Sequence, residues 1–268
     1  MKFNDLNIVK DDSQNGVSVK SINVPLQNGQ LPPMDEIQKK IEENKPLVER
    51  LGYHPTIVFC LSNETYSQAF FQCWARTLAY LAKQEVEFVI ASSMSQNPCV
   101  AKNLCIGGDM TKGKNQKLFQ DSFDFTHLLF INSSAIWSPE NLRDLLVRNV
   151  DVVSGVFSLN NNSIGAVKNV DYDSFKEKGL NCILKSDIKD RTNLIEVDYT
   201  VINFLLVKKN VFSSLEYPWF RTEVLKISDD IQDVMSDEFV FCRDLKKNGY
   251  KIYIDPTVVI GNQQLLVI

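Results

Sequence analysis

The sequence lacks most of the features that mark membrane, secreted and metal-binding proteins. Its most apolar runs, such as IVFCL and HLLFI, are only as long as a β-strand, so none predicts a membrane span. The start, MKFNDLNIVKDD, has no signal-peptide core. The cysteines are scattered at positions 60, 73, 99, 105, 182 and 242 without a CxxC pair. We therefore expect reduced core thiols in an intracellular protein, with neither a disulfide framework nor a zinc site.

Histidine is also scarce, and positive charge is not in excess over negative charge. His54 and His127 have no second ligand at metal spacing, so both are interpreted as structural. The formal net charge of −4 imposes no basic face, which argues against nucleic acid as a partner. The 268 residues, 44% hydrophobic and 23% charged, are enough for one large or two small soluble domains.

What is present is a regular alternation of strand and helix patterns. Apolar strands are predicted at residues 55–62, 86–93, 126–131 and 150–158, and helices at 63–84 and 138–149, with a loop that enters a helix at 97–108. This β-α-β-α-β-α-β order predicts an α/β fold with a mostly parallel sheet and helices on both faces. Ligands of such open sheets lie beyond the carboxyl ends of the strands.

Three polar segments follow predicted strands at that edge. They are Ser62-Asn63-Glu64, Ser92-Ser93 and Asn132-Ser133-Ser134. Their convergence predicts a binding site. The alternative is that strands commonly end in polar loops, and for any one segment alone that alternative is favoured.

The two flanking regions are less regular. Residues 1–33 look like a polar arm, and the helical pattern of residues 34–52 is interrupted near Pro46. Residues 159–200 are rich in strands and loops. Further on, we expect a strand and then a short helix starting near Lys208, a helix at 236–248 and a last strand.

Several segments, in this order, resemble the GT-A type nucleotide-sugar glycosyltransferases, especially compact ones of phages and large viruses. They are VAKNLCI, DFTHLLFINSSAIWSPENL, DVVSGVFS, VDYTVINFLLVKKNVF, YPWFR, SDEFVFCRDLKKNGYKIYIDP and VIGNQQ. These segments cover roughly residues 56–264, so we expect a GT-A-like domain (51–268) after an N-terminal arm and helix (1–50). That domain would comprise a nucleotide-binding half (51–158) and a smaller mixed acceptor-side half (159–268). The resemblance also implies a UDP- or GDP-sugar donor and a glycan or other hydroxyl acceptor.

The sequence departs from this family where the family holds a metal ion. Asn132 and Ser134 stand at the two aspartates of the family's Asp-x-Asp motif, and Asn262 stands at its histidine. Mg²⁺ and Mn²⁺ prefer anionic oxygen ligands, and they neutralise the diphosphate that leaves the sugar. Neutral side chains at all three positions predict weak binding of Mn²⁺ or Mg²⁺ at most.

Three interpretations follow from this loss. In the first, which we rank ahead, the enzyme works without a metal, and positive side chains or backbone donors stabilise the diphosphate. Lys102 and Arg221 are available for this role, as are Lys112, Lys114 and Lys117, although these three loop lysines are otherwise ordinary surface charges. In the second, other carboxylates hold the ion, such as Asp109, Asp229, Asp230 or Asp233. In the third, the fold has lost turnover and binds a nucleotide or carbohydrate without catalysis.

An acidic pair favours activity. Asp237 and Glu238 occupy the family's catalytic acidic pair in swapped order, and Glu238 falls at the base that would deprotonate the acceptor hydroxyl. The alternative is structural, because Ser236 is a good helix N-cap and acids in the first turn complement the helix dipole. The two roles are equally weighted for Glu238, and the structural one is favoured for Asp237.

The remaining site predictions follow the resemblance. The donor is expected to contact Ser62, Asn63, Ser92, Lys102, Asn103, Asn132, Ser133 and Ser134. Trp219, Phe220 and Arg221 are expected on the acceptor side, although the two aromatic residues are equally suited to plugging a core edge. A dehydrogenase is set aside, because FCLSNETYS follows the first strand in place of a Gly-x-Gly-x-x-Gly motif. We expect a cytoplasmic location, or the host cytoplasm if the protein is viral.

Overall fold

The computed structural model describes residues 5–8, 22–25, 33–35, 38, 45–170, 181–226 and 232–263. The chain divides into two compact units, Met1–Gly52 and Tyr53–Ile268. In the first unit, β1 (Asp5–Ile8) pairs antiparallel with β2 (Ile22–Pro25). Helix α2 (Leu47–Leu51) starts directly after Pro46 and ends at Gly52, whose φ of +73° favours glycine. Most of the helical pattern predicted before Pro46 lies outside the described residues.

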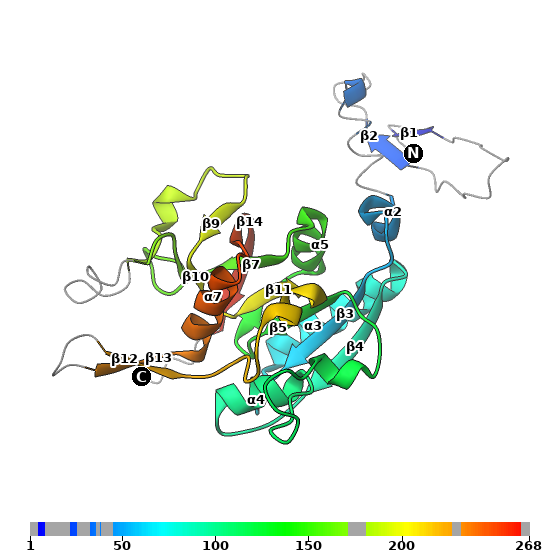
Figure 1. Ribbon diagram of the computed structural model, residues 1–268. Helices are drawn as coiled ribbons and strands as arrows, with labels where there is room; N and C mark the ends of the chain where they lie inside the picture. Colours follow the sequence, from blue (N-terminus) through cyan, green and yellow to red (C-terminus); the bar gives the residue numbers. More distant parts are fainter. Residues whose placement is uncertain are drawn as a thin grey trace. The chain divides into compact units, whose positions relative to one another are not determined.

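The second unit is built on an eight-stranded sheet (Figure 1). The strand order is β4–β3–β5–β11–β7–β14–β6, with β9 also paired to β14. Five strands run in one direction: β3 (Thr56–Leu61), β4 (Glu87–Ser92), β5 (His127–Ile131), β7 (Val152–Phe157) and β14 (Ile252–Asn262). The others are antiparallel to their neighbours: β6 (Ala135–Ile136), β9 (Ile195–Val197) and β11 (Phe204–Lys208). The predicted α/β class with a mostly parallel sheet is confirmed.

Helices cover both faces of this sheet (Figure 1). They are α3 (Gln68–Lys83), α4 (Pro98–Cys105), α5 (Pro139–Arg148) and α7 (Asp237–Lys247). The period of two along β5 explains the two layers. Leu128 and Phe130 point into a cluster that includes Phe241 of α7, while Phe59 on β3 packs edge-on against Trp74 of α3 at 4.7 Å.

One predicted helix boundary was wrong, and the difference shapes the edge of the sheet. The pattern predicted a helix from residue 63, whereas α3 starts at Gln68. Ser67 ends the loop because its hydroxyl accepts the N–H of Phe70 and caps the helix. Asn63 and Glu64 are therefore loop residues immediately beyond β3.

Among its described residues, the second half adds short strands and the α-helix α7. β8 (Ala166–Val167) pairs with β10 (Tyr199–Thr200), and β12 (Glu223–Lys226) pairs with β13 (Gln232–Met235) to form a ribbon. Two short 3₁₀ helices, η2 (Lys185–Asp187) and η3 (Lys209–Ser214), complete this region, in addition to η1 (Leu118–Asp121) in the first half. β13 leads directly into α7, where the Ser236 hydroxyl accepts the N–H of Phe239. This cap fixes the first turn of α7.

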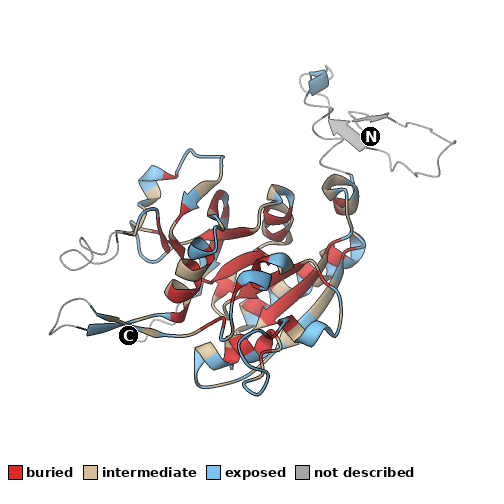
Figure 2. Ribbon diagram, in the orientation of Figure 1, coloured by how far each residue is buried: buried red, intermediate tan, exposed pale blue. Residues whose placement is uncertain are grey.

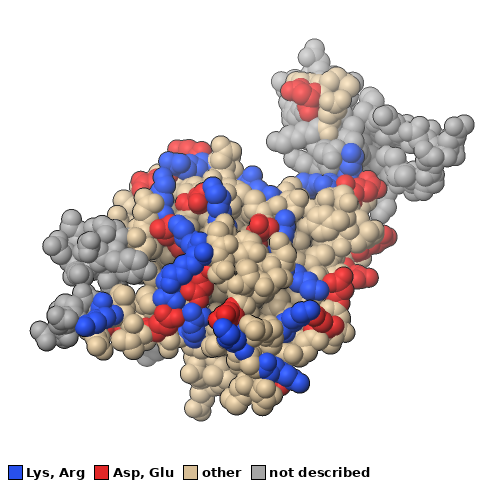
Figure 3. Space-filling model, viewed as in Figure 1, with Lys and Arg blue, Asp and Glu red and all other residues tan. Residues whose placement is uncertain are grey.

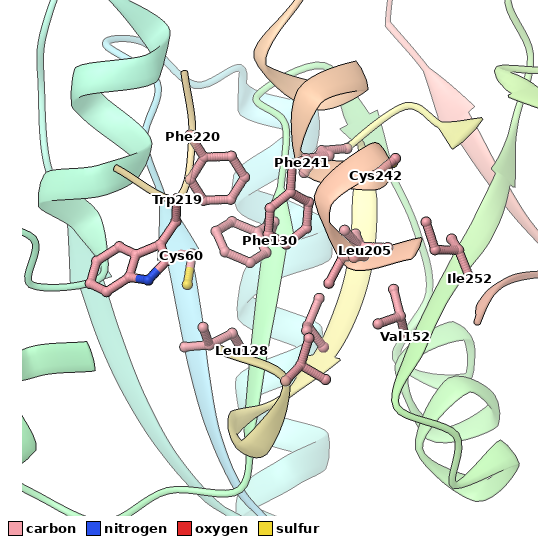
Figure 4. Close-up of a cluster of buried hydrophobic side chains, with 14 of the residues drawn as sticks. Cys60, Leu128, Phe130, Val152, Leu205, Trp219, Phe220, Phe241, Cys242 and Ile252 are labelled. Atoms are coloured by element: carbon pink, nitrogen blue, oxygen red, sulfur yellow. The ribbon is translucent and has the colours of Figure 1, made fainter. Parts of the chain in front are cut away.

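A large hydrophobic cluster packs α7 and the end of α4 against the sheet. The strands of the sheet are mostly buried (Figure 2). The aromatic rings of the cluster contact one another in turn: the ring centre of Phe220 lies 5.3 Å from that of Phe130, which it meets edge-on, and 4.7 Å from that of Phe241, on which it stacks (Figure 4). Trp219 is also in this cluster and is only 2% exposed. The cluster forms a rigid base below the carboxyl end of β5. In the part of the chain that the structure describes, no helix is both long and apolar enough for a bilayer.

Candidate functional site

A cleft of about 550 Å³ lies at the carboxyl ends of β3 and β5. It is lined by Cys60, Ser62, Asn63, Glu64, Ser95, Gln96, Pro98, Lys102, Phe130, Ile131, Asn132, Ile202, Asp237 and Glu238. These residues come from the loop after β3, the start and middle of α4, the end of β5, the segment before β11 and the first turn of α7. Of the three polar segments predicted to converge at this edge, the cleft is lined by Ser62-Asn63-Glu64 and by Asn132, and not by Ser92, Ser93, Ser133 or Ser134.

The chain turns at the tip of β5, and hydrogen bonds hold this turn. The side-chain oxygen of Asn132 accepts hydrogen bonds from the backbone N–H and the hydroxyl of Ser134, both at 3.0 Å. The side-chain oxygen of Asn63 accepts the N–H of Ser133 at 3.2 Å, which joins the loop after β3 to this tip. The backbone N–H of Asn132 donates to the carbonyl of Asn203. The tip is held by neutral amides and hydroxyls.

This donor set does not fit a hard divalent ion. Asn262 lies beside the tip, because it pairs with Ala135 in the register of β14 and β6. However, the oxygen of Asn132 already accepts two hydrogen bonds from Ser134, and the three positions together offer no anionic oxygen. Within the described ranges, no group of three or more His, Cys, Asp or Glu side chains is placed to hold a metal.

The other carboxylates named for a metal also lie elsewhere or outside the description. Asp109 accepts hydrogen bonds from the backbone and hydroxyl of Thr111, which lowers the pKa of its carboxyl. Asp233 is exposed on β13. Asp229 and Asp230 lie outside the described residues.

The charged part of the cleft is a cluster around Lys102. Its ammonium lies 2.7 Å from Oδ2 of Asp237 and 3.7 Å from Oε1 of Glu238. The side chains of Lys102 and Asp237 are 13% and 12% exposed, whereas that of Glu238 is 23% exposed. Asp237 is therefore the closer partner of the ammonium, and Glu238 is the more accessible carboxylate.

The environment of Glu238 raises its pKa above the usual range of a glutamic acid. Burial is the largest cause, and the negative charge of Asp237 adds to it. Lys102, the backbone of Ile202 and the hydroxyl of Tyr199 act in the opposite direction. A carboxylate with a raised pKa is a stronger base than an ordinary one, provided that the pH keeps it ionised.

Helix geometry explains why both acids are here. Ser236 is the N-cap, so Asp237 and Glu238 occupy the first turn of α7, where the helix dipole favours negative charge. Asp237 and Glu238 therefore line the cleft and also stabilise the first turn of α7, which is the structural role that the sequence predicts for them.

Several predicted donor contacts have other roles. Asn103 is only 5% exposed. Its side-chain nitrogen donates to the carbonyls of Cys99 and Phe220, and its side-chain oxygen accepts the N–H of Phe220. Asn103 thus joins α4 to the YPWFR segment. Ser92 is exposed at the end of the edge strand β4 and does not line the cleft. Ser133 and Ser134 hold the turn at the tip without lining the cleft.

The residues expected on the acceptor side lie outside the cleft. Trp219 and Phe220 are 2% and 1% exposed and lie inside the hydrophobic cluster. Their position therefore fits the alternative role, packing in the core. Arg221 forms ion pairs with Glu223 and Asp244 and does not line the cleft.

The loop lysines and histidines are also elsewhere. Lys114 pairs with Glu216, Lys117 pairs with Asp121, and neither these lysines nor Lys112 line the cleft. His127 starts β5 at the end of the strand opposite the cleft, and burial lowers its pKa to about 4, so it is a neutral core residue.

Sequence reasoning missed some lining residues. Ser95, Gln96 and Ile202 line the cleft, and Tyr199 contacts Glu238 from β10. No pattern in the sequence connects Tyr199 with Glu238, because they meet only through the packing of α7 against β10. Glu64 also lines the cleft. It belongs to the polar segment Ser62-Asn63-Glu64, but the sequence predicts no individual role for it.

No family model and no curated protein matches the chain. Among solved structures, it is similar to "Crystal Structure of A197 from STIV", with 15% identity and a TM-score of 0.43 over 80% of this chain and 96% of that chain. It is also similar to "Crystal structure of GalNAc-T7 with UDP, GalNAc and Mn2+", with 9% identity and a TM-score of 0.45 over 80% of this chain and 43% of that chain. The fold class follows from the strand order and helices described above, and membership of the GT-A glycosyltransferases stays a prediction.

Proposed function

We propose that the protein transfers a sugar from a nucleoside-diphosphate sugar to a hydroxyl acceptor, without a tightly bound metal ion. The observation that carries this proposal is the position of Glu238, an accessible carboxylate with a raised pKa in a cleft at the carboxyl end of the sheet. Amides and hydroxyls around it, from Ser62, Asn63 and Asn132, suit the hydroxyls of a sugar.

In this reaction, Glu238 accepts the proton of the acceptor hydroxyl as its oxygen attacks the anomeric carbon of the donor. A new carbon–oxygen bond forms, the bond from that carbon to the diphosphate breaks, and the nucleoside diphosphate leaves with the electron pair. Lys102 is the cationic side chain among the described lining residues, so its ammonium is the group available to the leaving phosphate.

Metal independence is tested with a panel of UDP- and GDP-sugars, assayed for donor hydrolysis and transfer with and without EDTA. Because neutral residues stand at the metal positions, we expect turnover with EDTA to stay within about twofold of that without it, since no metal then supplies transition-state stabilisation. Loss of turnover in EDTA, restored by Mn²⁺, would contradict this expectation.

A second test changes the tip of β5 itself. The triple variant Asn132→Asp, Ser134→Asp, Asn262→His places two carboxylates and an imidazole on neighbouring backbone positions. We expect calorimetry to detect Mn²⁺ binding to this variant and none to the unchanged protein. Titration of the variant without any heat of binding would argue that these three positions do not face a common ligand.

One observation favours a second function, binding of a carbohydrate without catalysis. The described lining residues include one ammonium, Lys102, and three carboxylates, of Glu64, Asp237 and Glu238, so the cleft offers little net attraction to a diphosphate. A neutral sugar would be bound by the amides and hydroxyls regardless of this charge balance. Saturable binding of a sugar or nucleotide, without turnover in the donor panel, would select this function.

A further inference from the structure

Each oxygen of the Glu238 carboxylate has a partner of its own, from a different element of the fold. The hydroxyl of Tyr199, on β10, donates to Oε2 at 3.4 Å. The ammonium of Lys102, on α4, lies 3.7 Å from Oε1. These contacts restrict rotation of the carboxylate, which would otherwise turn freely about the last bond of the side chain.

The partners are themselves fixed. Tyr199 is 9% exposed, and its ring lies 5.5 Å from that of Phe239, the residue after Glu238 on α7. Lys102 is held by Asp237 at 2.7 Å, and its ammonium lies 5.8 Å from the centre of the Phe220 ring. A rigid pair of partners therefore faces the more accessible of the two acids.

We propose that Tyr199, as a positioning residue, and Lys102, in addition to its place beside the leaving phosphate, hold the Glu238 carboxylate, one near each oxygen, in the orientation in which it faces the cleft. Asp237 acts one step further out, because it fixes Lys102. The catalytic meaning of this arrangement rests on the proposed sugar transfer, whereas the arrangement itself is tested without any substrate.

The charged and titratable groups around Glu238 set the sign of the expected effect. They are Lys102 on α4, Asp237 and Cys242 on α7, Tyr199 on β10, and Glu64, which lines the same cleft. Tyr199 and Lys102 each stabilise the ionised carboxylate and so lower the pKa of Glu238 against the effect of burial. Removing either partner must raise the pKa of Glu238 further.

The first experiment is Tyr199→Phe, which removes the hydroxyl and keeps the ring in its packing. The pKa of Glu238 is measured by NMR titration of protein labelled with ¹³C in the glutamate carboxyl groups, with the signal assigned by its absence from Glu238→Gln. We expect the pKa of Glu238 to be higher in Tyr199→Phe than in the unchanged protein. Tyr250→Phe is the matched control, because its hydroxyl contacts Ser214 and Asn210 rather than an acid of the cleft.

A second variant, Lys102→Met, removes the ammonium and keeps a long apolar side chain. It must raise the pKa of Glu238 in the same direction, and it covers the case in which Tyr199→Phe fails to fold. A pKa of Glu238 that is the same in Tyr199→Phe, Tyr250→Phe and the unchanged protein overturns the role of Tyr199. An unchanged value in Lys102→Met overturns that of Lys102.

If the protein turns over a sugar donor, Tyr199→Phe has a kinetic signature too. We expect kcat to fall about tenfold with KM nearly unchanged, because orientation of the base matters in the transition state and little in donor binding. The acidic limb of the pH–rate profile must move to higher pH together with the pKa measured by NMR. Should no donor be turned over while the NMR shifts are found, sugar transfer fails and the positioning of Glu238 stands.

Discussion

Glu238→Gln is expected to reduce sugar transfer by about 10²- to 10⁴-fold, the usual contribution of a general base. Glutamine keeps the shape of the side chain and can still accept from Tyr199, but it cannot take a proton from an acceptor hydroxyl. Binding of the donor should change little, because the proton transfer occurs in the transition state. Steady-state kinetics and calorimetry on the same preparations measure both quantities.

The control for this substitution is Glu216→Gln. Glu216 is another glutamate paired with a lysine, Lys114, but its side chain is 65% exposed and lies outside the cleft. This variant should keep full transfer. Equal rates for Glu238→Gln and the unchanged protein would remove Glu238 from the role of base, and with it the observation on which the proposed transfer depends.

The pH dependence of transfer has a defined sign. Because the pKa of Glu238 is raised, its ionised, basic form is lost at a higher pH than for an ordinary glutamate as the solution becomes acidic. Activity should therefore fall on the acidic side at a pH above the usual range of a glutamic acid. The transfer rate and the protonated fraction of Glu238, the latter from NMR, are measured over the same range of pH. If Glu238 is the base, the rate falls as the protonated fraction rises.

Arg148→Ala is expected to lower the free energy of unfolding by about 3–5 kcal/mol, the usual cost of leaving a buried charge without its partner. Asp255, on β14, is fully buried at 0% exposure, and the guanidinium of Arg148 on α5 bonds both of its oxygens, at 2.6 and 3.2 Å. Without this arginine, the carboxylate of Asp255 keeps only the backbone and hydroxyl of Thr257. Urea unfolding followed by circular dichroism measures the loss.

Arg143→Ala is the matched control on the same helix. Arg143 pairs with its neighbour Asp144 near the surface, so we expect its loss to cost less than about 1 kcal/mol. Arg148→Lys should lie between the two, because lysine keeps the charge and loses the two-pronged contact. If Arg148→Ala lowers the free energy of unfolding no more than Arg143→Ala does, the charge of Asp255 is stabilised by other groups.

Local residue patterns were sufficient for most elements of the sheet unit. The apolar runs of β3, β5 and β7, and the helical spacing of Phe70, Cys73, Thr77 and Leu81, predict elements that the structure contains. The start of α3 was misplaced by five residues, because the polar residues before Ser67 fit a helix as well as a loop and only the cap decides between them. Such short-range signals depend on neighbours in the chain.

Side-chain roles at the site were harder to predict, since they depend on contacts between distant residues. The sequence alone determined the α/β alternation, the neutral tip of β5 and the presence of two acids at the start of α7. Only the tertiary structure decided that Lys102 meets Asp237 across 135 positions of the chain, that Trp219 and Phe220 are buried, and that Tyr199 reaches Glu238. The physical reason is that periodicity and capping act within a few residues, whereas burial and pairing of charges exist only after the layers have packed.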